Sequence, residues 1–103
     1  MQVIKEGHTY ELENFEDRVN AGQVVQFIEK QPIEGTDHLG TIQDGTTNEE
    51  VLKMLIDRMN HLQSKFPCKA NAIVITNLEE SLMWLNKRTE DRIERNVEGK
   101  NLS

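Results

Sequence analysis

The first 46 residues alternate between apolar and polar positions, whereas the rest of the chain follows a helical period. Short runs rich in β-branched and aromatic residues are typical of strands. Three such runs predict strands over residues 2–5, 9–13 and 23–30, and residues 39–43 predict a short fourth. The connections between them are too short for helical crossovers, so we expect an antiparallel β-meander.

A helix is predicted over residues 48–64. Thr47 and Glu50 have the spacing of a capping box, in which each side chain satisfies a backbone amide of the first turn. The apolar stripe of this helix consists of Val51, Leu55, Met59 and Leu62, widened by Leu52 and Ile56. The helix ends near Ser64, because Pro67 disfavours helical geometry in the preceding residue.

A second, long helix is predicted over residues 71–96, with Asn71 as a candidate N-cap. The β-branched residues 72–76 favour a strand, but they continue in helical phase into the stripe that follows, so we assign them to the helix. That core-facing stripe consists of Leu78, Leu82, Leu85 and Thr89. Residues after Gly99 are expected to have no fixed structure.

The excess of apolar residues around this second helix indicates an oligomer. Residues 82–85 are all apolar and together cover about 300° of the helix circumference, more than one intramolecular contact can bury. Only 36% of the 103 residues are hydrophobic, which is low for a self-sufficient monomer. The sequence therefore predicts an α+β fold that assembles as a homo-oligomer. It forms a single domain, residues 1–103, with a β-rich part (1–46), a two-helix antiparallel hairpin (47–99) and a tail (100–103).

The net charge of −6 argues against general binding to nucleic acid polymers or to anionic membranes, which both require a basic surface. Any anionic ligand must therefore be held by a local cluster of cations. The single cysteine excludes an internal disulfide framework, and the sequence has neither a signal peptide nor an apolar run of about 18 residues. We therefore expect a cytoplasmic protein.

One such cluster is the arginine face of the second helix. Arg88, Arg92 and Arg95 follow Trp84 at helical spacing, with Lys87 beside them. Guanidinium groups match phosphate oxygens, and an indole can stack on adenine. The alternative is a solvated helix face on which the arginines pair with the acidic residues at 90, 91 and 94, and spacing alone favours that alternative.

The connector between the two helices carries further candidates. Phe66 and Asn71 flank it, and loop residues serve ligands more often than they fill a core, although Phe66 could equally cover the end of the hairpin. Cys68 has no histidine or acid at a spacing that suggests catalysis, and the three histidines have no metal-ligand spacing. We expect no enzymatic activity and no cofactor.

Several motifs of the second half resemble one family, the shared domain of the Thoeris anti-defence type 1 and anti-CBASS type 2 phage proteins. The resemblance rests on residues 44–52, 55–59, 65–71, 75–76, 78–80, 82–85, 87–89, 91–92 and 97–99. Residues 8–15 and 26–30 are similar to the β-rich extension of the Thoeris branch, which the anti-CBASS branch lacks. One departure is Asn96, where relatives often have glycine.

The resemblance implies a non-enzymatic sponge, a homohexamer in known members, which sequesters cyclic nucleotide immune signals in the cytoplasm of the bacterial host during phage infection. In the Thoeris branch the signal is glycocyclic ADP-ribose made by TIR-domain enzymes, and some relatives hold cyclic di- or trinucleotides. Arg88 and Arg92 would hold the pyrophosphate, Phe66 or Trp84 would stack on adenine, and Asn71 or Thr76 would bond a ribose or base edge. The expected ligand-binding residues are Phe66, Asn71, Thr76, Trp84, Lys87, Arg88, Arg92 and Arg58.

Three other functions stay open from the sequence. The protein could bind only the cyclic oligonucleotides of CBASS systems, it could be a structural helical oligomer without a nucleotide ligand, or it could be an enzyme that processes the nucleotide. Binding of a nucleotide would exclude the structural oligomer. Recovery of chemically altered ligand would favour the enzyme.

Overall fold

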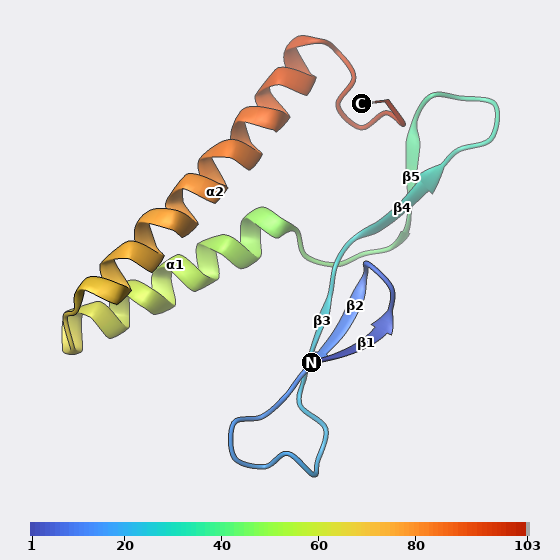
Figure 1. Cartoon of the computed structure of the whole chain (residues 1–103). Helices are drawn as coiled ribbons and strands as arrows, with labels where there is room; N and C mark the ends of the chain where they lie inside the picture. The colour runs from blue at the N-terminus through green and yellow to red at the C-terminus, as the bar shows by residue number, and fades with distance from the viewer. Residues whose placement is uncertain (103) are drawn as a thin grey trace. The chain divides into compact units, whose positions relative to one another are not determined.

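The computed structural model describes residues 1–102 and consists of two compact units, Met1–Thr47 and the chain from Asn48 onward (Figure 1). The first unit contains five strands and the second contains two helices. The α+β class and the order of antiparallel strands followed by two helices are therefore confirmed.

The strands of the first unit form two separate antiparallel sheets. Their bounds are β1 Gln2–Lys5, β2 Thr9–Leu12, β3 Gln23–Gln26, β4 Glu29–Pro32 and β5 Leu39–Gln43. One sheet has the order β1-β2-β3, and the other pairs β4 with β5.

The expectation of one strand over residues 23–30 is wrong, because the chain changes hydrogen-bonding partners between Gln26 and Glu29. The Thr46 amide donates to the Gln26 carbonyl at 2.8 Å, and the Ile28 amide donates to the Thr46 carbonyl at 2.9 Å. After Phe27, whose amide still donates to the His8 carbonyl at 2.7 Å, the chain leaves β2 and pairs with Thr46 and then with β5. The strand-like run of residues 23–30 is continuous in the sequence, but its strand pairing changes partway along.

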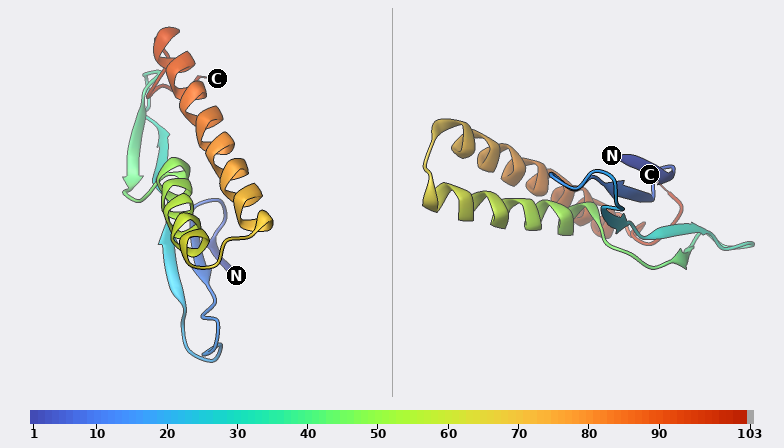
Figure 2. Two further views of the ribbon diagram at one scale, coloured as in Figure 1. Left: turned by 90° about the vertical axis from the view of Figure 1, so that its left-hand side faces the viewer. Right: turned by 90° about the horizontal axis from the view of Figure 1, so that it is seen from below.

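The second unit is an antiparallel helical hairpin, in which α1 (Asn48–Lys65) packs against α2 (Lys69–Glu94) (Figure 2). Helix α1 begins directly after Thr47, as the capping spacing predicts. Residues 72–76 are helical, which confirms their assignment to the long helix. Neither helix of the described chain is long and apolar enough to cross a membrane.

The predicted start of α2 at Asn71 is wrong. The helix begins at Lys69, and its N-cap is Cys68, which has an extended backbone and a Sγ that accepts the Asn71 amide at 3.4 Å. A thiol seldom takes this position, because Ser, Thr, Asp and Asn are the usual N-caps. The candidate cap was therefore placed three residues too late.

The facing sides of the helices follow the predicted stripes with one exception. The half-buried apolar positions are Val51, Leu52, Ile56, Met59 and Leu62 on α1 and Ile75, Leu78, Leu82 and Leu85 on α2. Leu55 lies within the angular range of this stripe but is exposed in the single chain. Among the described residues no hydrophobic side chain is fully buried, so the single chain has no closed core.

Helix α2 ends at Glu94 rather than at residue 96, because Asn96 adopts a left-handed backbone with φ of 59°. Asparagine tolerates this conformation better than most residues other than glycine. Gly99 is also left-handed, with φ of 78°. These two residues turn the chain back beside the last turn of α2. There the Arg92 guanidinium donates hydrogen bonds to it, as described below.

Candidate functional site

Phe66 and Asn71 lie together at the tip of the hairpin. The Asn71 side-chain amide donates to the Phe66 carbonyl at 3.5 Å. The connector is fixed further by Gln63, whose side chain bonds both the amide and the carbonyl of Cys68, at 3.0 and 3.2 Å. The Phe66 ring is 77% exposed, so it does not cover the hairpin end in the single chain. We name Phe66 and Asn71 the tip group.

Trp84, Lys87 and Arg88 are exposed on one stretch of α2, about one helical turn from end to end. The indole is 56% exposed, and Met83 next to it is 52% exposed. Within the part of the chain that the structure describes, no ion pair or hydrogen bond engages the side chains of Lys87 and Arg88. An aromatic surface and two available cations are the groups that an adenine-containing phosphate ligand requires. Together with Arg92, these residues form the arginine group.

Arg92 is not exposed beside Arg88, because the C-terminal segment (residues 97–102) surrounds its guanidinium. Only 6% of Arg92 is exposed, and it is the one buried residue of the described chain. Its Nη2 donates to the carbonyls of Val97 at 2.9 Å and Lys100 at 3.0 Å, and its Nη1 donates to the Leu102 carbonyl. Its Nε donates to the Glu98 carboxylate at 3.1 Å.

These contacts bear on two expectations, the lack of fixed structure after Gly99 and the binding of phosphate by Arg92. The expectation of no fixed structure after Gly99 is wrong for residues 100–102, because two of the carbonyls on Arg92 belong to them, while Ser103 lies outside the described residues. Four of the five N–H donors of Arg92 are occupied within the chain. In this conformation Arg92 has no free pair of donors for a phosphate.

The remaining candidates occupy other parts of the hairpin. Arg95 follows α2 as its C-cap, and its Nε donates to the Asp91 carboxylate at 3.1 Å, one of the acid–arginine pairs expected of a solvated face. Thr76 is exposed on the first half of α2, and Arg58 is exposed on α1. Neither is in the tip group or the arginine group.

The tip group and the arginine group are far apart within one chain. Asn71 and Arg88 are separated along α2 by roughly 25 Å, at about 1.5 Å rise per residue. A nucleotide-sized ligand does not bridge that distance. The hairpin therefore carries two part-sites rather than one complete site. The distance between them follows from the residue numbers once both lie on one helix.

An open groove that the sequence did not indicate runs between the helices. Its volume is about 810 Å³, and Ile56, Leu82 and Met83 supply its apolar lining. The rims carry both Lys53 and Lys87 and the three acids Asp57, Glu79 and Glu90. Mixed charge around an apolar floor suits an amphipathic helix better than an anion.

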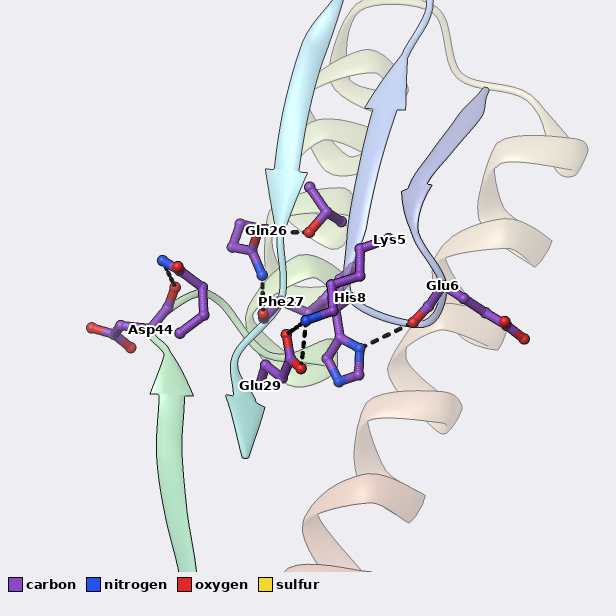
Figure 3. Close-up of polar contacts among 9 residues, drawn as sticks. Lys5, Glu6, His8, Gln26, Phe27, Glu29 and Asp44 are labelled. Carbon is purple, nitrogen blue, oxygen red and sulfur yellow. Dashed lines mark hydrogen bonds and ion pairs between the residues drawn. The ribbon is translucent and has the colours of Figure 1, made fainter. Parts of the chain in front are cut away.

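In the first unit, an ion pair joins the two sheets (Figure 3). The Lys5 Nζ of β1 donates to both carboxylate oxygens of Glu29 in β4, each at 2.7 Å, and the Glu29 side chain is only 13% exposed. The Lys5 ammonium, through this hydrogen bond, lowers the pKa of Glu29 below its ordinary value. Beside it, the Thr9 hydroxyl donates to Gln26 at 2.7 Å. These contacts stabilise the first unit (Met1–Thr47), which we call the β unit, and they need no ligand.

Comparison with known proteins reveals two similarities. Residues 24–90 match the family model described as "Acb2/Tad1, hairpin domain", which is more than half of the chain. A 57-residue stretch is 53% identical to "Thoeris anti-defense 1" of Bacillus phage SBSphiJ7. That stretch makes up 54% of this chain and 40% of the relative, so the chain spans less than half of the relative's length. The family match begins at β3 and includes most of the hairpin.

Proposed function

Because this chain belongs to the Acb2/Tad1 hairpin-domain family, we propose that it is a phage anti-defence protein that sequesters cyclic nucleotide immune signals without cleaving them. The observation that carries the proposal is the family match, because residues 24–90 contain all but one of the candidate ligand-binding residues. The name of the phage relative, Thoeris anti-defense 1, supports the Thoeris system as the target. The protein would act in the cytoplasm of the infected bacterium.

Glycocyclic ADP-ribose is the proposed principal ligand. Arg88 and Lys87 would bind its pyrophosphate, joined by Arg92 once that side chain is released. Trp84 or Phe66 would stack on the adenine, since both rings have exposed faces. Asn71 or Thr76 would bond a ribose or base edge, and Arg58 would add positive charge on α1.

The proposed site is shared between subunits. The two part-sites lie too far apart to meet within one chain, so the tip group of one copy would complete the arginine group of another. The lack of any fully buried hydrophobic side chain among the described residues supports assembly, as do the exposed Met83 and Trp84. The groove between α1 and α2 would hold a helix of a neighbouring copy, and we propose a homohexamer.

Cyclic di- and trinucleotides form a second proposed ligand class, because the family resemblance of the sequence implies that some relatives hold them. These ligands also present phosphates and purines, so the same chemistry recognises them. The two classes would compete if they share the arginine group, and they would bind independently if they do not.

A thermal-shift panel tests the proposal. Glycocyclic ADP-ribose isomers, cyclic di- and trinucleotides and linear ADP-ribose are each added to the protein, and a bound ligand raises the unfolding temperature by mass action. We expect stabilisation by at least one glycocyclic ADP-ribose isomer and little by linear ADP-ribose. The absence of stabilisation by every cyclic nucleotide would favour a structural oligomer instead.

Mixing of variants tests the shared site. Phe66→Ala and Arg88→Ala each disable one part-site, so each protein alone should bind weakly. When the two are unfolded together and refolded as mixed oligomers, some sites receive an intact part-site from each variant. Recovery of tight binding in the mixture supports a shared site, whereas a mixture as weak as its components contradicts it.

A further inference from the structure

The atoms around the Arg92 guanidinium are arranged as a ligand for it. Three backbone carbonyls and one carboxylate converge on the fork, and all four belong to residues 97–102. Carboxylate and carbonyl oxygens engage a guanidinium through the same N–H donors that phosphate oxygens use. The C-terminal segment therefore fills the place that the proposed function gives to a phosphate.

The backbone of this segment makes two further hydrogen bonds. Besides the bonds to the guanidinium, the Val97 amide donates to the Arg92 carbonyl at 2.9 Å, and the Lys100 amide donates to the Val97 carbonyl at 3.0 Å. The Leu102 side chain is 49% exposed, and that of Glu98 is 46% exposed. The segment lies outside α2, so its release leaves the helix's own backbone bonds in place.

We propose that the C-terminal segment is an internal competitor that occupies Arg92 until a ligand phosphate displaces it. The inference rests on the proposed function and adds a mode of regulation to its site. A buried guanidinium without partners is strongly destabilising, so Arg92 needs a substitute anion while the site is empty. Exchange of the segment for phosphate keeps the fork paired in both states.

Competition lowers the apparent affinity by the fraction of molecules in which Arg92 is free. Any change that weakens the segment's hold on Arg92 should then tighten ligand binding. A segment that instead formed part of the ligand site would have the opposite effect when weakened. Whether ligand affinity rises or falls when the segment is weakened therefore distinguishes a competitor from a part of the site.

The test compares Glu98→Gln with Glu94→Gln in the full chain. Both remove one negative charge near the end of α2, but only Glu98 bonds Arg92, so Glu94→Gln controls for net charge. Titration calorimetry with glycocyclic ADP-ribose, and separately with inorganic pyrophosphate, measures the affinity. We expect Glu98→Gln to bind about two- to fivefold more tightly than the wild type, the range for one partly exposed charged contact. Glu94→Gln should show at most a small change.

Termination of the chain after Asn96 is the stronger variant. It removes all four partners of the guanidinium, so tightening should exceed that of Glu98→Gln. Hydrogen exchange of the Val97 and Lys100 amides provides a readout in the wild type, because displacement breaks the bonds that protect them. We expect their exchange to accelerate when ligand binds.

Three outcomes would overturn the inference. These are slower exchange at Val97 and Lys100 on binding, an affinity of Glu98→Gln no tighter than that of Glu94→Gln, and binding of neither probe by any variant. Failure of the proposed function has a different signature. Suppose that no variant binds glycocyclic ADP-ribose but pyrophosphate binds Glu98→Gln more tightly than the wild type. The proposed function is then wrong, while the role of the C-terminal segment as a competitor is supported.

Discussion

Replacement of Arg92 by alanine removes the side chain that the proposed site and the C-terminal segment share. In the free protein the change deletes three hydrogen bonds to carbonyls and one ion pair with Glu98. In the bound state it deletes a fork on the ligand pyrophosphate. We therefore expect Arg92→Ala to loosen the C-terminal segment and to weaken ligand binding.

Arg92 is 6% exposed in the free protein because residues 97–102 cover it, so the expected loss is set by the phosphate contact that replaces them. A charge-assisted phosphate contact at a partly desolvated site contributes about 2 kcal/mol, which corresponds to a loss of affinity of roughly 30-fold. Arg92→Lys should recover only part of this, because one ammonium cannot reproduce a bidentate fork. Arg95→Ala should lower the affinity far less, because Arg95 is half exposed and bonds Asp91.

Titration calorimetry of glycocyclic ADP-ribose into the three variants measures these differences. Sedimentation of each variant must first show the wild-type assembly, because loss of the oligomer would imitate loss of the site. An Arg92→Ala protein that assembles normally and binds with wild-type affinity would refute the reasoning. Arg92 would then serve only to hold residues 97–102.

Three further predictions concern the β unit and the assembly. In Lys5→Gln, the pKa of Glu29 should rise toward its ordinary value in an NMR titration, while Lys30→Gln should leave it unchanged. Since the folded-state pKa of Glu29 is lowered, the ion pair stabilises the fold above the unfolded-state pKa of about 4.3 and loses that effect as the pH falls through the folded-state value. Gly22→Ala should lower the free energy of unfolding by about 1–3 kcal/mol relative to Ala21→Ser, because a Cβ at Gly22 would lie 1.6 Å from the Leu12 carbonyl oxygen. Sedimentation at micromolar concentration should show an assembly larger than a dimer, and a stable monomer would contradict the shared site.

The helical hairpin was the most predictable part of the fold. Its apolar period, the capping spacing at Thr47 and the absence of glycine and proline within α2 are local signals, and they set both helices to within two residues. The end of β3 at Gln26 has no such signal, because it depends on pairing with Thr46 and β5, which are distant in the sequence. Periodicity reports which face of a segment is apolar, but not where its hydrogen-bonding partner ends.

The role of Arg92 shows the same limit at the candidate site. Helical spacing predicts that Trp84, Arg88 and Arg92 follow one another along the helix, and the first two are exposed as expected. The turn through Asn96 and Gly99 brings six residues of the C-terminal segment back to Arg92, and no helical pattern describes that contact. Asn96 followed three residues later by Gly99 was the available sequence signal for such a turn.

The central claim is that the protein captures its signal without altering it. The most direct test incubates an excess of protein with glycocyclic ADP-ribose, removes unbound signal, denatures the complex by heat and assays the supernatant by mass spectrometry and by activation of the signal-dependent defence effector. The sponge account predicts that the captured signal is recovered at full mass and full activity. Loss of the signal, or recovery of a cleaved product, would contradict the account and indicate an enzyme.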